Sequence, residues 1–210
     1  GYTYYYKVRA VAADGEKSAY SAVVSRTCDC ARPVVKASNN AATGTVTLSW
    51  SKVDGAKEYI VYRATSKNGT YTKLCTTTGT SLTNTSAKAG YTYYYKVKAV
   101  AAKTSDADSA FSAIVYRTCD CARPTVKVAL NANGDPKLTW GSVSGAGIYA
   151  VYRSTSKNGT YTKLASVKGT SLTNTSAKAG TTYYYKVKAI SARTSAANSA
   201  FSSIVSIKAK

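Results

Sequence analysis

One block of sequence returns twice along this chain, and this repeat limits the possible folds more than any other feature. The letters Gly-Tyr-Thr-Tyr-Tyr-Tyr-Lys-Val-Arg-Ala begin at Gly1, and close copies begin at Gly90 and Gly180. The copies differ in length between the strand-like runs, where loops tolerate insertions. The repeat predicts that residues 1–30 are the last two strands of one module, and that residues 31–121 and 122–210 are complete modules.

Within each copy, apolar and polar residues alternate, which is the pattern of a half-buried strand. Val46, Leu48 and Trp50 fall on one face of the first such run, and hydroxyl-bearing residues fall on the other. A second run covers residues 59–63, and Asn68-Gly69 after it predicts a tight type I′ hairpin turn. Thr and Tyr are abundant, which favours strands over helices. The chain is therefore expected to be all-β, built of short strands in β-sandwiches.

Three motifs occur in the same order in both complete copies. Trp50 and Trp140 close the second strand of their modules, and Tyr-x-Val-Tyr-Arg follows at residues 59–63 and 149–153. The third motif is Ala-Gly-x-Thr-Tyr-x-Tyr-x-Val on the sixth strand. Together these motifs resemble the fibronectin type III family over the whole chain. The resemblance implies tandem immunoglobulin-like (fibronectin type III) β-sandwiches.

The third motif looks like the tyrosine-corner segment of that family. The resemblance implies that the hydroxyls of Tyr4, Tyr93 and Tyr183 cap nearby backbone groups. The modules also look like those of cell-surface proteins from Gram-positive gut bacteria. Such modules serve adhesion, spacing and receptor roles alike, so the family does not by itself identify a ligand.

Strand alternation predicts one buried row of side chains and one outward row on the sixth strand. Tyr93, Tyr95, Val97 and Ala99 belong to the buried row. The outward row is a candidate surface for a protein or glycan, because tyrosine offers a large and rigid contact area. Its rings could equally stabilise the sheet by covering neighbouring lysine stems. The candidate ligand-binding residues are Tyr62, Tyr94, Lys96, Lys98, Tyr152, Tyr184, Lys186 and Lys188.

The composition argues against catalysis. Histidine is absent, which excludes a histidine base, a Ser-His relay and a histidine-ligated metal. We expect no catalytic residues, no metal site and no cofactor. Lys and Arg number 29 against 9 acidic residues, which gives a net charge of +20. This excess favours an anionic cell-wall polymer as a partner, whereas the absence of a recognised nucleic-acid motif argues against specific nucleic-acid binding.

The five cysteines suggest disulfides more readily than metal ligands. Cys28 and Cys30, and likewise Cys119 and Cys121, are separated by one residue, which is closer than paired zinc ligands usually stand. Cys75 is expected near the end of the module that Cys28 and Cys30 precede, so a disulfide between this linker and the module is one hypothesis. Free or half-buried thiols are the other.

The leading functional hypothesis is a non-catalytic, extracellular repeat module of a bacterial surface protein. It would act as a spacer and as an adhesive surface, for example toward a host glycoprotein or immunoglobulin, with avidity from repeated weak contacts. One alternative is an accessory module of a secreted polysaccharide-degrading enzyme. Another is a subunit of a self-assembling surface polymer that associates through residues 1–30, because unpaired strands invite a partner. No stretch is apolar enough for membrane insertion.

Overall fold

The computed structural model describes residues 1–210, which fall into two compact units. The first unit comprises Gly1–Lys36, Ser49–Leu82 and Tyr95–Val115, and the second comprises Ala37–Leu48, Thr83–Tyr94 and Tyr116–Lys210. Each unit contains one of the two Ala-Arg-Pro linkers, at residues 31–33 and 122–124. The module boundaries at residues 30 and 121 come from the sequence repeat. That these modules are also separate domains stays a prediction.

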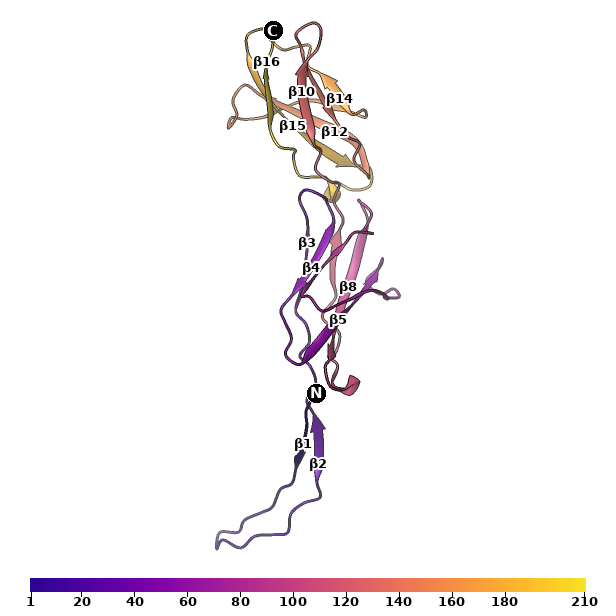
Figure 1. Ribbon diagram of the computed structural model, residues 1–210, viewed down its shortest axis with the longest axis vertical. Coiled ribbons are helices and arrows are strands. Elements are labelled where there is room, and N and C mark those ends of the chain that lie inside the picture. The colour runs from indigo at the N-terminus through magenta and orange to yellow at the C-terminus, as the bar shows by residue number, and fades with distance from the viewer. The chain divides into compact units, whose positions relative to one another are not determined.

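The chain is all-β, as predicted, and strand pairs such as β1–β2, β10–β11 and β12–β15 are antiparallel (Figure 1). A two-stranded hairpin comes first, formed by β1 (Thr3–Tyr6) and β2 (Val24–Thr27). The middle repeat has two sheets. One has the order β3 (Val35–Asn39), β4 (Val46–Trp50), β7 (Ser81–Asn84). The other has the order β6 (Thr72–Thr77), β5 (Ala56–Ala64), β8 (Thr92–Ala101), β9 (Val115–Thr118).

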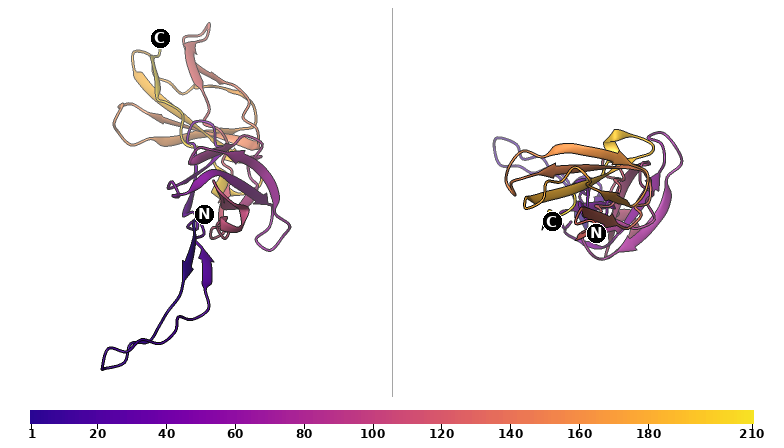
Figure 2. Two further views of the ribbon diagram at one scale, coloured as in Figure 1. Left: turned by 60° about the horizontal axis from the view of Figure 1, so that its bottom comes forward. Right: turned by 90° about the horizontal axis from the view of Figure 1, so that it is seen from above.

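The last repeat has the same two sheets, which Figure 2 shows from two further directions. The smaller sheet has the order β10 (Val126–Leu130), β11 (Pro136–Trp140), β14 (Ser171–Thr173). The larger has the order β13 (Thr162–Val167), β12 (Ala146–Ser154), β15 (Thr182–Ser191), β16 (Val205–Lys208). Short 3₁₀ turns, η1 (Ser105–Ala107) and η2 (Ser195–Ala197), follow β8 and β15. This repetition of sheet order explains the spacing of the sequence motifs.

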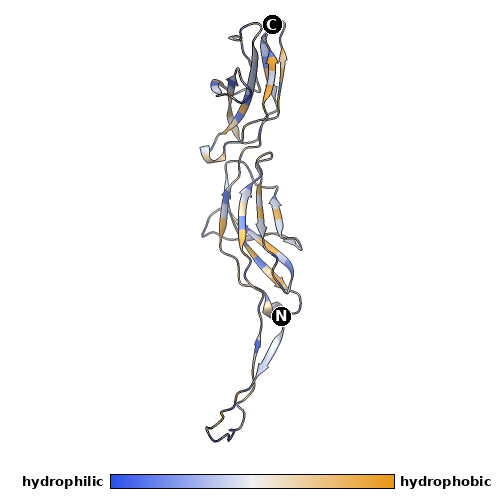
Figure 3. Ribbon diagram, turned by 90° about the vertical axis from the view of Figure 1, so that its left-hand side faces the viewer, coloured by the Kyte–Doolittle hydropathy of each residue, from blue (hydrophilic) through white to orange (hydrophobic).

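The alternation predicted for the strands is confirmed by their burial. Tyr93, Tyr95, Val97 and Ala99 of β8 are buried, and the residues between them are half-buried. Apolar and polar residues alternate along the strands in Figure 3. Because side chains point to opposite faces at every step of a strand, this pattern presents one apolar row to the opposite sheet. The predicted core row is therefore the observed one.

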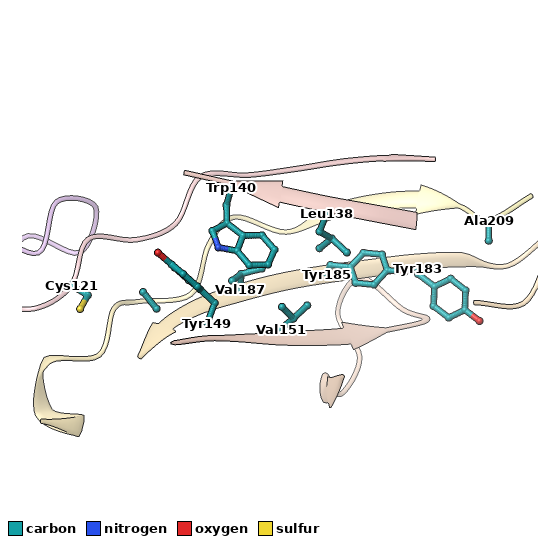
Figure 4. Close-up of a cluster of buried hydrophobic side chains, with 10 residues drawn as sticks. Cys121, Leu138, Trp140, Tyr149, Val151, Tyr183, Tyr185, Val187 and Ala209 are labelled. Carbon is teal, nitrogen blue, oxygen red and sulfur yellow. The ribbon is translucent and has the colours of Figure 1, made fainter. Parts of the chain in front are cut away.

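The core of the last repeat lies between its two sheets, as Figure 4 shows. Leu138 and Trp140 of β11 face side chains of β12 and β15, including Val151 and Tyr185. The indole nitrogen of Trp140 is buried without a hydrogen-bond partner, but the ring lies 5.4 Å from that of Tyr149. A tilted aromatic pair of this kind stabilises the core beyond its area of contact.

The tyrosine corners expected from the family resemblance are present in the two sandwiches. The hydroxyl of Tyr93 accepts a hydrogen bond from the backbone N–H of Lys88 at 3.1 Å, and that of Tyr183 accepts one from Lys178 at 3.0 Å. The expectation was wrong for Tyr4, which is 50% exposed and caps no backbone group. Tyr4 lies in a sheet of only two strands, β1 and β2, so its side chain stays half exposed.

The turn at Asn68-Gly69 differs from the expected type I′ turn. That turn needs positive φ at both central residues, yet no residue other than glycine has positive φ, and Gly69 is not among the glycines that do. Instead the N–H of Gly69 donates to the carbonyl of Ser66 at 3.3 Å. Seven residues separate β5 from β6, and this longer loop removes the need for the tight turn.

A serine motif replaces part of the hydrogen-bond ladder before the last strand of each sandwich. In the middle repeat, the Oγ of Ser109 accepts from the N–H of Ala99 at 2.8 Å, and the Oγ of Ser112 accepts from the N–H of Val97 at 3.0 Å. Ser199 and Ser202 make the same contacts with β15. The strand proper therefore begins only at Val115, and the serine hydroxyls satisfy buried N–H groups that would otherwise be unpaired.

Candidate functional site

The outward row proposed as a binding surface is half-buried, and its lysines lie against aromatic rings. In the middle repeat, the Nζ of Lys96 lies 4.0 Å from the ring centre of Phe111 and 4.7 Å from that of Tyr71. Tyr62 packs edge-on against Phe111 at 5.2 Å. We call this group, Lys96 with the rings of Tyr62, Tyr71 and Phe111, the first aromatic cage.

The last repeat has a second aromatic cage, made of Lys186 with the rings of Tyr152, Tyr161 and Phe201. The Nζ of Lys186 lies 4.3 Å from both the Tyr161 and the Phe201 ring centres. Tyr152 packs edge-on against Phe201 at 5.1 Å. A cation over a ring face contributes about 0.5–1 kcal/mol at an exposed site. These contacts favour the interpretation that the row stabilises the sheet, because the lysine of the same chain already occupies the ring faces.

Lys98 and Lys188 differ although they hold the same place in their repeats. The Nζ of Lys98 lies 3.0 Å from a carboxylate oxygen of Asp108. Desolvation by burial raises the pKa of Asp108. The hydrogen bond from the N–H of Ala101 and the ammonium of Lys98 together lower this pKa by more than burial raises it, so it lies below its ordinary value. Lys188 instead lies 5.4 Å from the ring centre of Phe201.

Tyr94 and Tyr184, the remaining pair of the predicted row, also have different surroundings. Tyr94 lies 5.6 Å from the ring of Tyr116 on β9, and Tyr116 is 66% exposed. Tyr184 instead pairs across the sheet with Ser206. The row thus lies together on the sheets as predicted, but its use as a ligand-binding surface stays a prediction.

A cavity of about 320 Å³ lies within the second unit beside Tyr116. Its other lining residues are Asn39, Arg117, Thr118, Asp120 and Ala196. The sequence motifs did not predict this cavity. The sequence does mark it by a departure from the repeat, since Ser25 and Ser206 occupy the position that Tyr116 has in the middle copy.

Each unit also contains a contact between a linker and the 3₁₀ turn of the repeat that follows it. In the first unit, the N–H of Cys30 donates to the carbonyl of Ala107 at 2.8 Å, and Lys103 Nζ lies 3.3 Å from the ring centre of Tyr2. In the second unit, the N–H of Cys121 donates to the carbonyl of Ala197 at 2.8 Å.

The second linker contact also has its cation and ring. The guanidinium carbon of Arg193 lies 4.0 Å from the ring centre of Tyr91, and its Nη1 donates to the Tyr91 hydroxyl at 3.3 Å. We call these two arrangements the linker contacts, Tyr2 with Lys103 and Tyr91 with Arg193. The residues recur at matching places in the repeat, which is the sequence signal that could have revealed them.

All five cysteines are free thiols. Burial raises the pKa of the Cys30, Cys119 and Cys121 thiols, which makes them less reactive at neutral pH. The S–H of Cys119 donates to the carbonyl of Gly44 at 3.3 Å. Gly44 has positive φ, and a Cβ there would collide with the carbonyl of Asp120, so only glycine fits against this linker.

The hypothesis of a disulfide from Cys75 to the linker needs correction. Cys75 lies opposite Val61 on β5, whereas Cys30 lies beside Gly55, six residues earlier. At about 3.3 Å per residue this is a separation of about 20 Å, far beyond the reach of a disulfide. The strand that carries Cys75 continues two residues further, to Thr77, so the thiol does not reach the end of the sheet.

Two further features bear on function. No group of three or more Cys, Asp or Glu side chains lies close enough to hold a metal ion. No helix of the chain is long and apolar enough to cross a membrane.

Comparisons with known proteins relate the chain to parts of bacterial glycosidases. It is 34% identical over 84 residues to an amylopullulanase from Thermoanaerobacterium saccharolyticum, covering 40% of this chain and 6% of the relative. It is 32% identical over 212 aligned residues to exoglucanase B from Cellulomonas fimi, covering 89% of this chain and 18% of the relative. The chain therefore spans less than a fifth of the length of either relative. No family model matches the chain.

A solved structure has the same fold. A two-domain fibronectin type III segment of chicken tenascin aligns with 86% of this chain and 99% of its own, at 16% identity and a TM-score of 0.53. This likeness concerns the fold alone. With the repeated order of the sheets and the tyrosine corners at Tyr93 and Tyr183, it shows that this chain has the fibronectin type III fold.

Proposed function

We propose that this chain is a non-catalytic spacer segment of an extracellular bacterial protein, and that its linker contacts keep successive repeats from swinging freely. The protein that contains it would be a polysaccharide-degrading enzyme, as the names of the two bacterial relatives suggest. This is the accessory-module hypothesis, which the relatives support better than adhesion to a host protein.

The observation that carries the proposal is the repetition of the linker contact. A backbone hydrogen bond and a cation–ring contact occur at each linker, with Tyr2 and Lys103 at one and Tyr91 and Arg193 at the other. Each contact of this kind stabilises by about 1 kcal/mol, which is enough to bias a short linker toward one arrangement. The same contact at both linkers fits a spacer segment, which keeps the parts of a protein on either side of it apart.

The aromatic cages support a structural role for the outward row. Their ring faces are covered by Lys96 and Lys186 of the same chain. A ligand that stacked on these rings would have to displace a lysine first. The cages therefore suit a surface that strengthens its own sheet.

The proposal can be tested by ¹⁵N relaxation, which reports the rotational correlation time of each repeat in the whole chain. If the linker contact restrains motion, the middle and last repeats have one common correlation time. Tyr91→Thr copies the residue at the same place in the last repeat, Thr181, and should give the last repeat a shorter correlation time of its own.

Arg193→Lys is the matched conservative variant, because Lys103 already serves at the first linker. It should retain the common correlation time, and Lys168→Ala, which removes an exposed cation elsewhere, should do the same. Independent tumbling of the two repeats in the unmodified chain would contradict the spacer proposal.

A second candidate function is attachment to an anionic cell-wall polymer, which the net charge of +20 favours. The last repeat contributes most of this charge, with 13 basic residues and one acidic residue in 122–210. Binding of this kind is electrostatic, so it should weaken steeply with salt. Co-sedimentation with purified cell walls at low and high salt is the test, and retention that is independent of salt would contradict it.

A further inference from the structure

The cavity beside Tyr116 brings together polar groups that have no partner in the protein. Arg117 lines it with an exposed guanidinium, and Asp120 lines it with a half-buried carboxylate, and neither makes an ion pair. The amide nitrogen of Asn39 donates to the carbonyl of Thr118 at 2.8 Å, but its amide oxygen is buried without any partner. Because protein atoms cover this oxygen, Arg117 and Asp120 are the side chains whose polar groups a ligand in the cavity could meet.

An exposed aromatic ring stands at the same place. Tyr116 is 66% exposed, and Tyr94 lies behind it with ring centres 5.6 Å apart and ring planes inclined by 31°. Unlike the rings of the two aromatic cages, Tyr116 has no lysine or arginine among its ring contacts. An exposed face of this kind can receive the apolar face of a ligand.

The charges at the cavity point to an uncharged ligand. One guanidinium and one carboxylate balance each other, in contrast to the strongly basic chain as a whole. An anionic polymer would be repelled by Asp120. A ligand with many hydroxyl groups suits the site, because each hydroxyl can donate to the Asp120 carboxylate and accept from Arg117.

We propose that this cavity is a contact site for a neutral polysaccharide chain. A sugar ring would stack on Tyr116, and its hydroxyls would pair with Arg117 and Asp120. The volume of about 320 Å³ is at the small end of ligand pockets and suits one or two sugar rings of a longer chain. The site goes beyond the spacer function, since a segment can hold a distance without binding anything.

The Tyr116 ring and the polar side chains of the site come from the middle repeat, and the last repeat adds only Ala196. The last repeat has Leu130, Ser206, Ile207 and Lys208 where the middle repeat has Asn39, Tyr116, Arg117 and Thr118. No aromatic ring and no free amide stands there. The last repeat therefore supplies both the substitutions for a test and a built-in control.

The experiment is an NMR titration of the whole ¹⁵N-labelled chain with maltohexaose and, separately, with cellohexaose. Both probes consist of six glucose units, which are α-linked in maltohexaose and β-linked in cellohexaose. The comparison therefore shows which linkage the site prefers. We expect weak binding, with a Kd on the order of 1 mM, and shifts of the backbone amides of Thr118, Asp120 and Ala196 with one of the two. Tyr116→Ser and Arg117→Ile, which copy Ser206 and Ile207 of the last repeat, should each weaken binding by about tenfold.

Ser206→Ala, at the matching place in the last repeat, is the control and should leave the titration unchanged. Because Tyr116 is on the surface, the spectrum of Tyr116→Ser before titration should match that of the unmodified chain outside the site. The proposal is overturned if neither hexasaccharide shifts these amides, or if Tyr116→Ser binds as well as the unmodified chain. Neither result would affect the spacer proposal, whose readout is the rotational correlation time.

Discussion

The same sequence motif occurs in two settings in this protein, in the hairpin of residues 1–30 and in residues 180–210 of the last repeat. Their strand registers are equivalent, with Tyr4 opposite Arg26 in one and Tyr183 opposite Ile207 in the other. The serine contacts also agree. The Oγ of Ser21 accepts from Val8 at 3.0 Å, as that of Ser202 does from Val187.

The two settings differ in burial. Tyr4 and Tyr6 are 50% and 53% exposed, whereas their counterparts Tyr183 and Tyr185 are 5% and 0% exposed. The hairpin has the backbone of the motif without the opposite sheet that would cover it. The comparison therefore separates what the strand pair forms by itself from what the sandwich adds, which is the burial of apolar surface that dominates stability.

The largest effect is expected from deleting one ring of the covered row. Tyr185→Ala should lower the free energy of unfolding by about 3–5 kcal/mol, because it leaves a cavity and removes the partner of buried Asn174. Tyr6→Ala, its counterpart in the hairpin, should change it by less than about 0.5 kcal/mol. Urea unfolding followed by circular dichroism measures both, and similar effects of the two substitutions would break the comparison.

The tyrosine corner gives a smaller and more specific difference. Tyr183→Phe keeps the ring but leaves the N–H of Lys178 without its acceptor, and should lower the stability by about 1–2 kcal/mol. Tyr4→Phe removes a hydroxyl that caps nothing, so no change is expected. Urea unfolding of Tyr183→Phe and Tyr4→Phe measures this difference. Tyr93→Phe, at the corner of the middle repeat, should behave like Tyr183→Phe. A stable Tyr183→Phe variant would mean that the corner hydroxyl is dispensable.

The cation–ring contacts are expected to contribute less. Lys186→Met keeps most of the side-chain volume but removes the charge between the Tyr161 and Phe201 rings, and should lower the stability by about 0.5–1 kcal/mol. In the hairpin, Lys7 lies over the ring of Tyr20. The substitution Lys7→Met should not measurably change the free energy of unfolding. A double-mutant cycle of Lys186→Met with Phe201→Leu isolates the pair, and a coupling energy of zero would contradict the assignment.

The smallest effect is a dependence on pH that distinguishes the two repeats. Because the pKa of Asp108 is lowered in the folded chain, its ionised form stabilises the fold above its unfolded pKa. This contribution is lost as the pH falls from about 4 through the folded pKa. Asp108→Asn, which copies Asn198, should cost under about 1 kcal/mol at pH 7 and flatten the acid dependence of thermal unfolding. An unchanged acid dependence would show that the pair with Lys98 contributes nothing.

Much of the fold followed from patterns that depend on neighbouring residues. The alternation of Val46, Leu48 and Trp50, and of Tyr93 through Ala99, predicted which face of each strand is buried. This succeeded because a strand has a period of two, so one apolar row defines the core side. The tyrosine corners at Tyr93 and Tyr183 were expected from the family resemblance, and their partners lie five residues upstream.

The candidate sites were harder to predict because their members come from distant parts of the chain. The cavity joins Asn39 with residues of β9 and with Ala196, and the linker contact joins Tyr91 with Arg193. Neither is visible as a local pattern. The cages were predicted only in part, as tyrosines beside lysines, because Phe111 and Phe201 come from the segment after the 3₁₀ turn. Self-association through residues 1–30 and binding of a host protein stay predictions.

The sequence by itself determined the strands, their register within a hairpin and the repetition of modules, because these depend on side-chain alternation and on short-range hydrogen bonds. Only the tertiary structure decided which tyrosines are covered, where the thiol of Cys75 lies and which rings keep a free face. The physical reason is that burial and charge pairing depend on what the opposite sheet or the next linker brings within a few ångströms, and the same ten residues meet different neighbours in the hairpin and in the sandwich.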